Sequence, residues 1–148
     1  MTAPLYNAEI LRLAASIPRH ERLPDPMGSA ERRSPICGSR VTVDVDTDAD
    51  GRIERVGLLV RACALGQASS SLLAANMIGR TPEELAAASD ALTAWLAGGE
   101  DMPDWPGIAI FTPALSVTGR HASIRLAFEA AAAAAAQARD RARPLAAE

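Results

Sequence analysis

The chain contains no lysine, so arginine supplies all 15 of its basic side chains. Against 18 acidic residues these leave a formal net charge of −3. This balance argues against a nucleic-acid partner, because proteins that bind nucleic acids usually present a basic face. The sequence also lacks a run of about 18–20 apolar residues, and we therefore expect neither a membrane span nor a membrane partner. The first residues lack the basic lead of a secretory signal, so the predicted location is the cytoplasm.

Cysteine is scarce as well, and the two residues present are Cys37 and Cys63. A chain of 148 residues can bury its own core without disulfides, and we expect residues 1–148 to form a single domain. In a cytoplasmic protein, isolated thiols are more often metal ligands, reactive groups or buried free thiols than a disulfide. The two cysteines are therefore the first candidates for a functional site.

Two neighbouring segments alternate apolar and polar residues, which is typical of half-buried β-strands. Residues 40–46 read RVTVDVD and residues 52–62 read RIERVGLLVRA, with a turn signal at Asp50–Gly51 between them. The pattern predicts an antiparallel hairpin with one buried, valine-rich side. The proline-rich segment 18–36 instead predicts an irregular connection, with room for a short extended piece but no more.

Helical periodicity occupies most of the remaining sequence, with Asn7 and Thr81 as predicted N-caps. The predicted helices span residues 7–17, 65–78, 81–98 and about 120–143. Residues 108–115 are apolar but contain a proline, and they predict a short strand or a buried coil. A hairpin followed by a group of helices indicates an α+β fold rather than alternating βαβ units.

The predicted hairpin brings the two cysteines to the same end of the sheet. Cys37 precedes the first strand and Cys63 follows the second, and these two ends are neighbours in an antiparallel hairpin. Cys63 also precedes a helix, whose unpaired N–H groups favour a thiolate. Gly38 and Gly66 leave space beside the sulfurs. The residues alone leave two interpretations open, a metal or sulfur site and a pair of buried structural thiols.

Several segments together resemble the NifU/IscU-like family of iron–sulfur cluster scaffolds, in particular its SufU-type branch. They are PRHERLPDP, SPICGSRVTVDVD, GRIERVGLLVRACALGQASSSLLA, IGRTPEEL and RHASIRLAFEAA, within roughly residues 5–135. The resemblance implies a SufE/NifU-like α+β fold, in which a small antiparallel sheet packs against several helices. It also implies a non-enzymatic scaffold that binds iron or a transient [2Fe–2S] cluster at three cysteines and an aspartate.

Carried onto this sequence, the family's first two cysteines match Cys37 and Cys63. The aspartate position falls on Ser39 and the third cysteine position on Ser123, so two of the four ligand positions differ. A serine hydroxyl is a poor ligand for iron, and His121 is the candidate substitute because imidazole binds both iron and zinc. Two chains could instead supply four thiolates together, which predicts a homodimer as one arrangement.

The predicted function is a scaffold-like protein that binds iron and sulfide, or accepts sulfur, through Cys37 and Cys63. The resemblance implies a cysteine desulfurase and other cluster-assembly proteins as its partners. The two serines keep alternatives open. One is a diverged member that acts as an accessory binding protein, and the other is a zinc-binding sulfur acceptor that needs fewer ligands.

Overall fold

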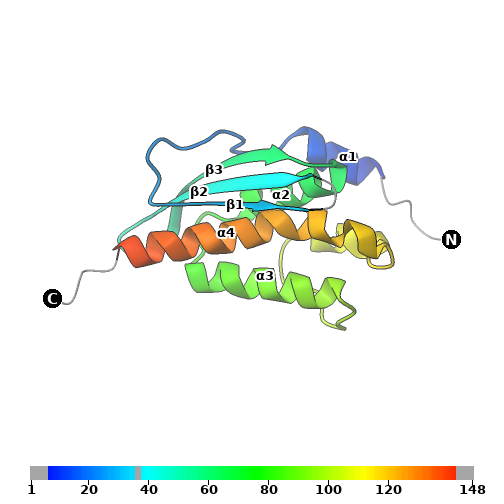
Figure 1. Ribbon diagram of the computed structural model, residues 1–148. Coiled ribbons are helices and arrows are strands. Elements are labelled where there is room, and N and C mark those ends of the chain that lie inside the picture. Colours follow the sequence, from blue (N-terminus) through cyan, green and yellow to red (C-terminus); the bar gives the residue numbers. More distant parts are fainter. Residues whose placement is uncertain (1–6, 36–37, 143–148) are drawn as a thin grey trace.

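The computed structural model describes residues 7–35 and 38–142. A three-stranded antiparallel sheet in the order β1-β2-β3 packs against helices (Figure 1). In chain order the elements are α1 (Ala8–Ala15), β1 (Gly28–Arg33), β2 (Arg40–Thr47), β3 (Ile53–Arg61), α2 (Ala64–Asn76), α3 (Pro82–Leu96), the 3-10 helices η1 (Ile108–Ala114) and η2 (Thr118–Arg120), and α4 (His121–Ala142). The predicted α+β class, the hairpin and the predicted helices are confirmed.

The β2–β3 hairpin forms as its alternating pattern predicts, with antiparallel pairing along both strands. One face carries the valines of β2 and the apolar residues of β3 into the core. These buried side chains are Val41, Val43, Val45, Val56, Leu58 and Val60. The hairpin is thus held by the hydrophobic effect on one face, while its end at Arg61 leads directly into α2.

A third strand, β1, lies in the segment for which the sequence predicted an irregular connection with at most a short extended piece, and the prediction was wrong in leaving out a strand of the sheet. Gly28 of β1 pairs with Val45 and Arg33 pairs with Arg40, so β1 is an edge strand beside β2. The nearby prolines fall outside its bounds and remove no hydrogen bond from the ladder. Its sequence, GSAERR, has little β-propensity, and the strand is stabilised by pairing with β2 and by contact with α4.

The polar face of β2 is covered too, whereas the sequence predicted a strand with only one buried side. The segment 19–27, the blue loop of Figure 1, runs over this face and supplies hydrogen-bond donors. The N–H of Leu23 donates to Asp44 at 3.0 Å, and the N–H of Met27 donates to Asp46 at 2.8 Å. Both carboxylates are buried, and they are tolerated there because they are hydrogen-bonded.

The same loop closes the outer edge of β3. The carbonyl oxygen of Arg19 accepts a hydrogen bond from the N–H of Leu58 at 3.0 Å. The Nε2 atom of His20 accepts one from the N–H of Val60 at 3.1 Å. His20, for which the sequence indicated no role, therefore satisfies a backbone donor at the edge of the sheet.

The longest helix, α4, runs along the strands and lies between the sheet and α3 (Figure 1). Its buried side is built largely from alanines, which are Ala127, Ala130, Ala131, Ala134, Ala135 and Ala138. These small side chains let the helix backbone approach the sheet closely. A Cβ atom added at Gly28 would lie 1.9 Å from the carbonyl oxygen of Ala134.

Two further segments settle the remaining expectations. Thr81 and Glu84 form the complete capping box that begins α3, as the sequence predicts. Residues 108–115 are not a strand, because Ile108–Ala114 forms the 3-10 helix η1. The side chain of Phe111 in this helix is buried. Across residues 7–35 and 38–142, no helix has both the length and the apolar character needed to cross a bilayer.

Candidate functional site

The candidate site lies where β3 ends and α2 begins. Cys63 is the N-cap residue of α2, and its extended backbone places its carbonyl 2.9 Å from the N–H of Gln67. The thiol makes no capping hydrogen bond, is not in a disulfide and is partly exposed. The sulfur therefore remains available for chemistry at the end of a helix where backbone N–H groups are unpaired.

The start of α4 lies directly against the first turns of α2. A Cβ atom added at Gly66 would lie 3.1 Å from the carbonyl oxygen of Ser123. Three residues further along α2, the hydroxyl of Ser69 donates to the carbonyl oxygen of Ile124 at 2.7 Å. The position that the resemblance assigns to a third ligand therefore lies beside the turn that follows Cys63, and its side chain is buried.

The serines after Cys63 serve packing and backbone satisfaction. Ser69, Ser70 and Ser71 are all buried on α2. Besides the bond from Ser69 to α4, the hydroxyl of Ser70 donates to the carbonyl oxygen of Gly66 at 2.8 Å within the helix. Small hydroxyl side chains at this helix–helix contact let the two helix starts approach one another while every buried hydroxyl keeps a partner.

His121 is the first residue of α4 and is buried, with 5% of its surface exposed. Its Nε2 atom lies 2.9 Å from the carbonyl oxygen of Ala114. Because a carbonyl oxygen only accepts hydrogen bonds, Nε2 must carry a proton, and in the neutral ring Nδ1 holds the free lone pair. A ring held in this way can offer Nδ1 alone to an iron ion, an arrangement common among metal-bound histidines. The role of His121 as a ligand stays a prediction.

Cys37 lies outside the described residues, so its predicted approach to Cys63 also stays a prediction. The residues around it belong to the connection between β1 and β2. The two ends of this connection are joined by a hydrogen bond of 2.9 Å from the N–H of Ser34 to the carbonyl oxygen of Ser39. Ser39 is buried. The next residue, Arg40, begins β2.

The end of the sheet from which this connection departs is the end that leads to Cys63. Arg40 of β2 pairs with Arg61 of β3, and Cys63 follows Arg61 by two residues. The strand pairing on which the predicted site depends is therefore present, although it extends only to the residues that flank the connection.

Side chains that could bind a metal ion are few in the described ranges. Among them, no three Cys, His, Asp or Glu side chains gather as they would around a metal ion. Cys63 offers one soft sulfur, and the buried hydroxyls of Ser39 and Ser123 are harder and weaker donors. One thiolate suffices to accept sulfur, whereas a cluster needs further thiolates, the first of them from Cys37.

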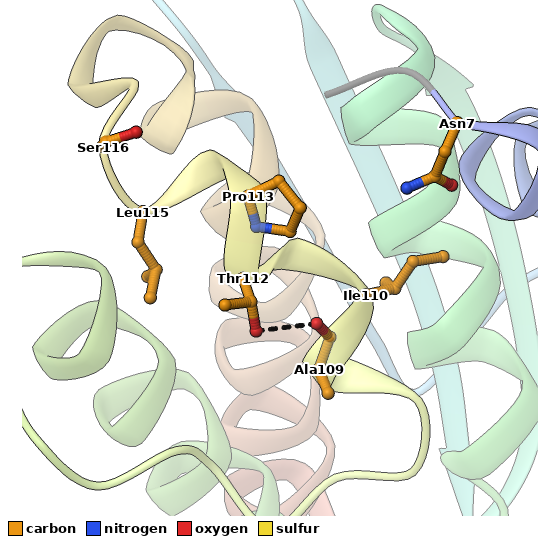
Figure 2. A pocket seen from close by; sticks show the side chains of 7 residues that line it. All are labelled: Asn7, Ala109, Ile110, Thr112, Pro113, Leu115 and Ser116. Carbon is orange, nitrogen blue, oxygen red and sulfur yellow. Dashed lines mark hydrogen bonds between the residues drawn. The ribbon is translucent and has the colours of Figure 1, made fainter. Parts of the chain in front are cut away.

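The hollow drawn in Figure 2 lies elsewhere, along η1. It measures about 520 Å³ and is lined by Asn7, Ala109, Ile110, Thr112, Pro113, Leu115 and Ser116. Within it the hydroxyl of Thr112 donates to the carbonyl oxygen of Ala109 at 2.8 Å (Figure 2). The described residues of its lining include no thiol, imidazole or carboxylate, so they offer no ligand for iron and no acceptor for sulfur.

Comparisons with known proteins agree with this fold. The chain is 38% identical to the N-terminal part of a nitrogen-fixing NifU-like protein from Brucella abortus, over 93% of this chain and 96% of that structure, with a TM-score of 0.84. It shares its fold with a SUF-system cluster assembly scaffold protein from Fervidobacterium islandicum AW-1, at 21% identity over 88% of this chain and 96% of that one, with a TM-score of 0.81.

Among curated proteins, the iron–sulfur cluster assembly scaffold protein IscU of Streptococcus pyogenes serotype M1 is 29% identical over 84 residues. This match covers 57% of the present chain and 52% of IscU, so it spans about half the length of that relative. No family model matches the chain. None of the names of these relatives refers to zinc. The chain belongs to the NifU/IscU-like family of iron–sulfur cluster assembly scaffold proteins.

Proposed function

We propose that this chain is a scaffold on which iron and sulfide are assembled into a transient [2Fe–2S] cluster, with Cys37 and Cys63 as the thiolate ligands. The observation that carries the proposal is the position of Cys63. Its thiol at the start of α2 makes no capping hydrogen bond and is not in a disulfide. The start of α4 at Ser123 lies against the next turn of α2. The same position in the family carries a cluster ligand, as the resemblance implies.

Sulfur acceptance is the step that the described residues support most directly, because it requires a single accessible thiolate. In this step the Cys63 thiolate attacks the outer sulfur of a persulfide on a cysteine desulfurase. The sulfur–sulfur bond of that persulfide breaks, and the desulfurase cysteine leaves as a thiolate, so Cys63 carries the transferred sulfur. The partner performs the preceding catalysis, and this chain acts in the cytoplasm as a non-enzymatic acceptor.

The serines at two ligand positions weaken the cluster shell. Hydroxyls of Ser39 and Ser123 are poor substitutes for a carboxylate and a thiolate. Nδ1 of His121 supplies an imidazole nitrogen as the third donor within one chain, or a second chain supplies two more thiolates in a homodimer. With the imidazole in place of a thiolate the cluster is held less firmly than by three cysteines and an aspartate, which suits a cargo that must be passed on.

Anaerobic reconstitution of the purified chain with ferrous iron and sulfide tests this function. The wild-type protein should develop the visible charge-transfer absorption of a [2Fe–2S] cluster and retain iron and sulfide after gel filtration. Cys63→Ser and Cys37→Ser should each abolish the absorption. Ala62→Ser is the matched control, because it introduces the same side chain beside Cys63 and leaves both thiols in place.

The gel-filtration elution volume distinguishes a cluster bound by one chain from a cluster shared by two chains. A cluster bound through His121 elutes with the monomer and is lost in His121→Phe, whereas a shared cluster elutes with the dimer. Wild-type protein that develops no absorption at any concentration contradicts cluster assembly. If it also shows no added sulfur by mass spectrometry after incubation with a desulfurase and cysteine, sulfur acceptance is contradicted too.

A further inference from the structure

Three arginines, one from each strand, lie side by side at the end of the sheet that leads to Cys63. Arg33 of β1 pairs with Arg40 of β2, and Arg40 pairs with Arg61 of β3. Residues paired directly across antiparallel strands project from the same face of the sheet. All three side chains line one open hollow of about 750 Å³. We refer to these three residues as the arginine row.

The charge of the arginine row is only partly balanced. The Nε atom of Arg33 lies 3.1 Å from one carboxylate oxygen of Glu31, and the Nε atom of Arg40 lies 3.9 Å from the other. Arg61 has no ion pair among the residues that the structure describes. Three guanidinium groups therefore share one carboxylate, in a chain whose formal net charge is −3.

Further along the same face, arginines and carboxylates match one to one. The Nε atom of Arg22 lies 2.6 Å from Oδ2 of Asp44, and the Nη2 atom of Arg55 lies 2.8 Å from Oδ2 of Asp46. Both carboxylates alternate in β2 with the buried valines, as Arg40 does. Among the strand residues of this face, the unbalanced positive charge therefore lies at the end that is next to the candidate site.

The arginine row is costly for the folded chain alone, since like charges placed directly across neighbouring strands repel one another. The fold does not need the charges for packing, because the side chain of Arg33 is 65% exposed and that of Arg40 is 37% exposed. Leu59 lies on the same face, paired with Thr42, and is 36% exposed. Guanidinium groups beside an exposed leucine suit a protein surface that presents carboxylates around an apolar residue.

We propose that the arginine row is a docking surface for an acidic segment of the partner that delivers sulfur to Cys63. The identity of that partner rests on the proposed function. The position of the row gives the reason for it, because Arg61 precedes Cys63 by two residues. An acidic segment bound along the row brings the partner's reactive group to the thiol at the start of α2.

Calorimetry on the full chain tests this surface with two probes. They are a hexaglutamate peptide and the cysteine desulfurase of the same organism. Arg61→Glu and Arg33→Glu should each weaken binding of both probes at least tenfold and flatten the decrease in affinity with added salt. Arg32→Glu is the matched control. Arg32 neighbours Arg33 on β1 but projects from the opposite face, where its guanidinium donates to the backbone carbonyl of Glu31 at 3.0 Å. Thermal unfolding of each variant shows that the fold is kept.

Each outcome separates docking from cluster assembly. If Arg61→Glu and Arg33→Glu bind both probes as Arg32→Glu does, the docking surface is overturned, even where a cluster forms. If inorganic phosphate binds as tightly as the peptide and displaces it, the row is a site for small anions and the proposal is equally overturned. If the peptide binds at the row while no cluster forms and no sulfur is accepted, docking stands and the proposed function fails.

Discussion

Ser39 and Ser123 place hydroxyl oxygen at positions where the resemblance implies a carboxylate and a thiolate, and both residues are buried. Ser123 is the more informative of the two, because its backbone is fixed against the start of α2 near Gly66. Restoring sulfur at this position tests whether the site has kept the geometry of a cluster scaffold.

We expect Ser123→Cys to increase the cluster content after reconstitution and to lengthen its lifetime severalfold, since a thiolate binds iron more strongly than a hydroxyl. Iron and sulfide content and the decay of visible absorption measure this. Ser89→Cys is the control, because it buries a new thiol on α3, which contributes no candidate ligand. Equal behaviour of the two variants would show that position 123 is too far from the cluster.

Asp44 makes the acid stability of the chain depend on one buried carboxylate. Burial alone would raise its pKa, but hydrogen bonds from Arg22, Ser29 and the N–H of Leu23 outweigh burial, and the pKa is lowered. A carboxylate whose pKa is lower in the folded than in the unfolded chain stabilises the fold above its unfolded pKa. That contribution is lost as the pH falls through the folded pKa, below about pH 4.

We therefore expect Asp44→Asn to reduce the free energy of unfolding by roughly 1–3 kcal/mol at neutral pH and to flatten its decline in acid. Urea unfolding between neutral pH and pH 3 measures both effects. Glu54→Gln provides the control, as it neutralises an exposed carboxylate on β3 with no ion pair in the described part of the chain. An acid decline as steep in Asp44→Asn as in the wild type would contradict this role.

At the scale of elements, the contact between α2 and α4 determines the geometry around Cys63. An added Cβ at Gly66 would lie 2.7 Å from the Cβ of Ala62 and 3.1 Å from the carbonyl oxygen of Ser123. Alanine is normally better than glycine inside a helix. We expect Gly66→Ala to reverse this preference, lowering the free energy of unfolding by about 1–3 kcal/mol and reducing cluster retention.

The matched control is Gly119→Ala in η2, where an added Cβ meets nothing within 4 Å. Chemical denaturation and reconstitution of both variants should show an effect at position 66 alone. A stabilised Gly66→Ala variant that still retains its cluster would mean that the two helix starts are free to separate.

The sequence predicted those elements whose own pattern specifies them. Strict alternation identified β2 and β3, and the residues of the capping box identified the start of α3. It missed β1, because GSAERR becomes a strand only through its partners β2 and α4. Without β1 there was no register to align Arg33 with Arg40, so the arginine row was also beyond sequence reasoning.

The candidate site was predictable to a similar degree. Sequence spacing was enough to place Cys63 at the start of a helix, and the structure confirms this position. It could not reveal that Nε2 of His121 is bound to Ala114, since that contact depends on how η1 folds back on α4. The meeting of Cys37 and Cys63 remains a prediction.

At the scale of the whole molecule, the alanines of α4 determine how closely the helix lies to the sheet. Because the backbone of Ala134 is in contact with Gly28, a larger side chain on this face has no space. We expect Ala134→Leu to lower the free energy of unfolding by about 1–3 kcal/mol, as overpacking of a dense core does. Ala136→Leu, on a half-buried position of the same helix, should cost much less. Thermal unfolding of the pair measures the difference, and equal midpoints would contradict close packing at Ala134.

The loop that closes β3 limits how this protein can associate with copies of itself. The outward N–H groups of Leu58 and Val60 are already bound to Arg19 and His20. A second chain cannot continue the sheet from this side by strand addition unless the loop is displaced first. Fibril-like stacking through β3 is thereby blocked, and a pair of chains that shares a cluster must instead meet through the surface around the sulfur of Cys63.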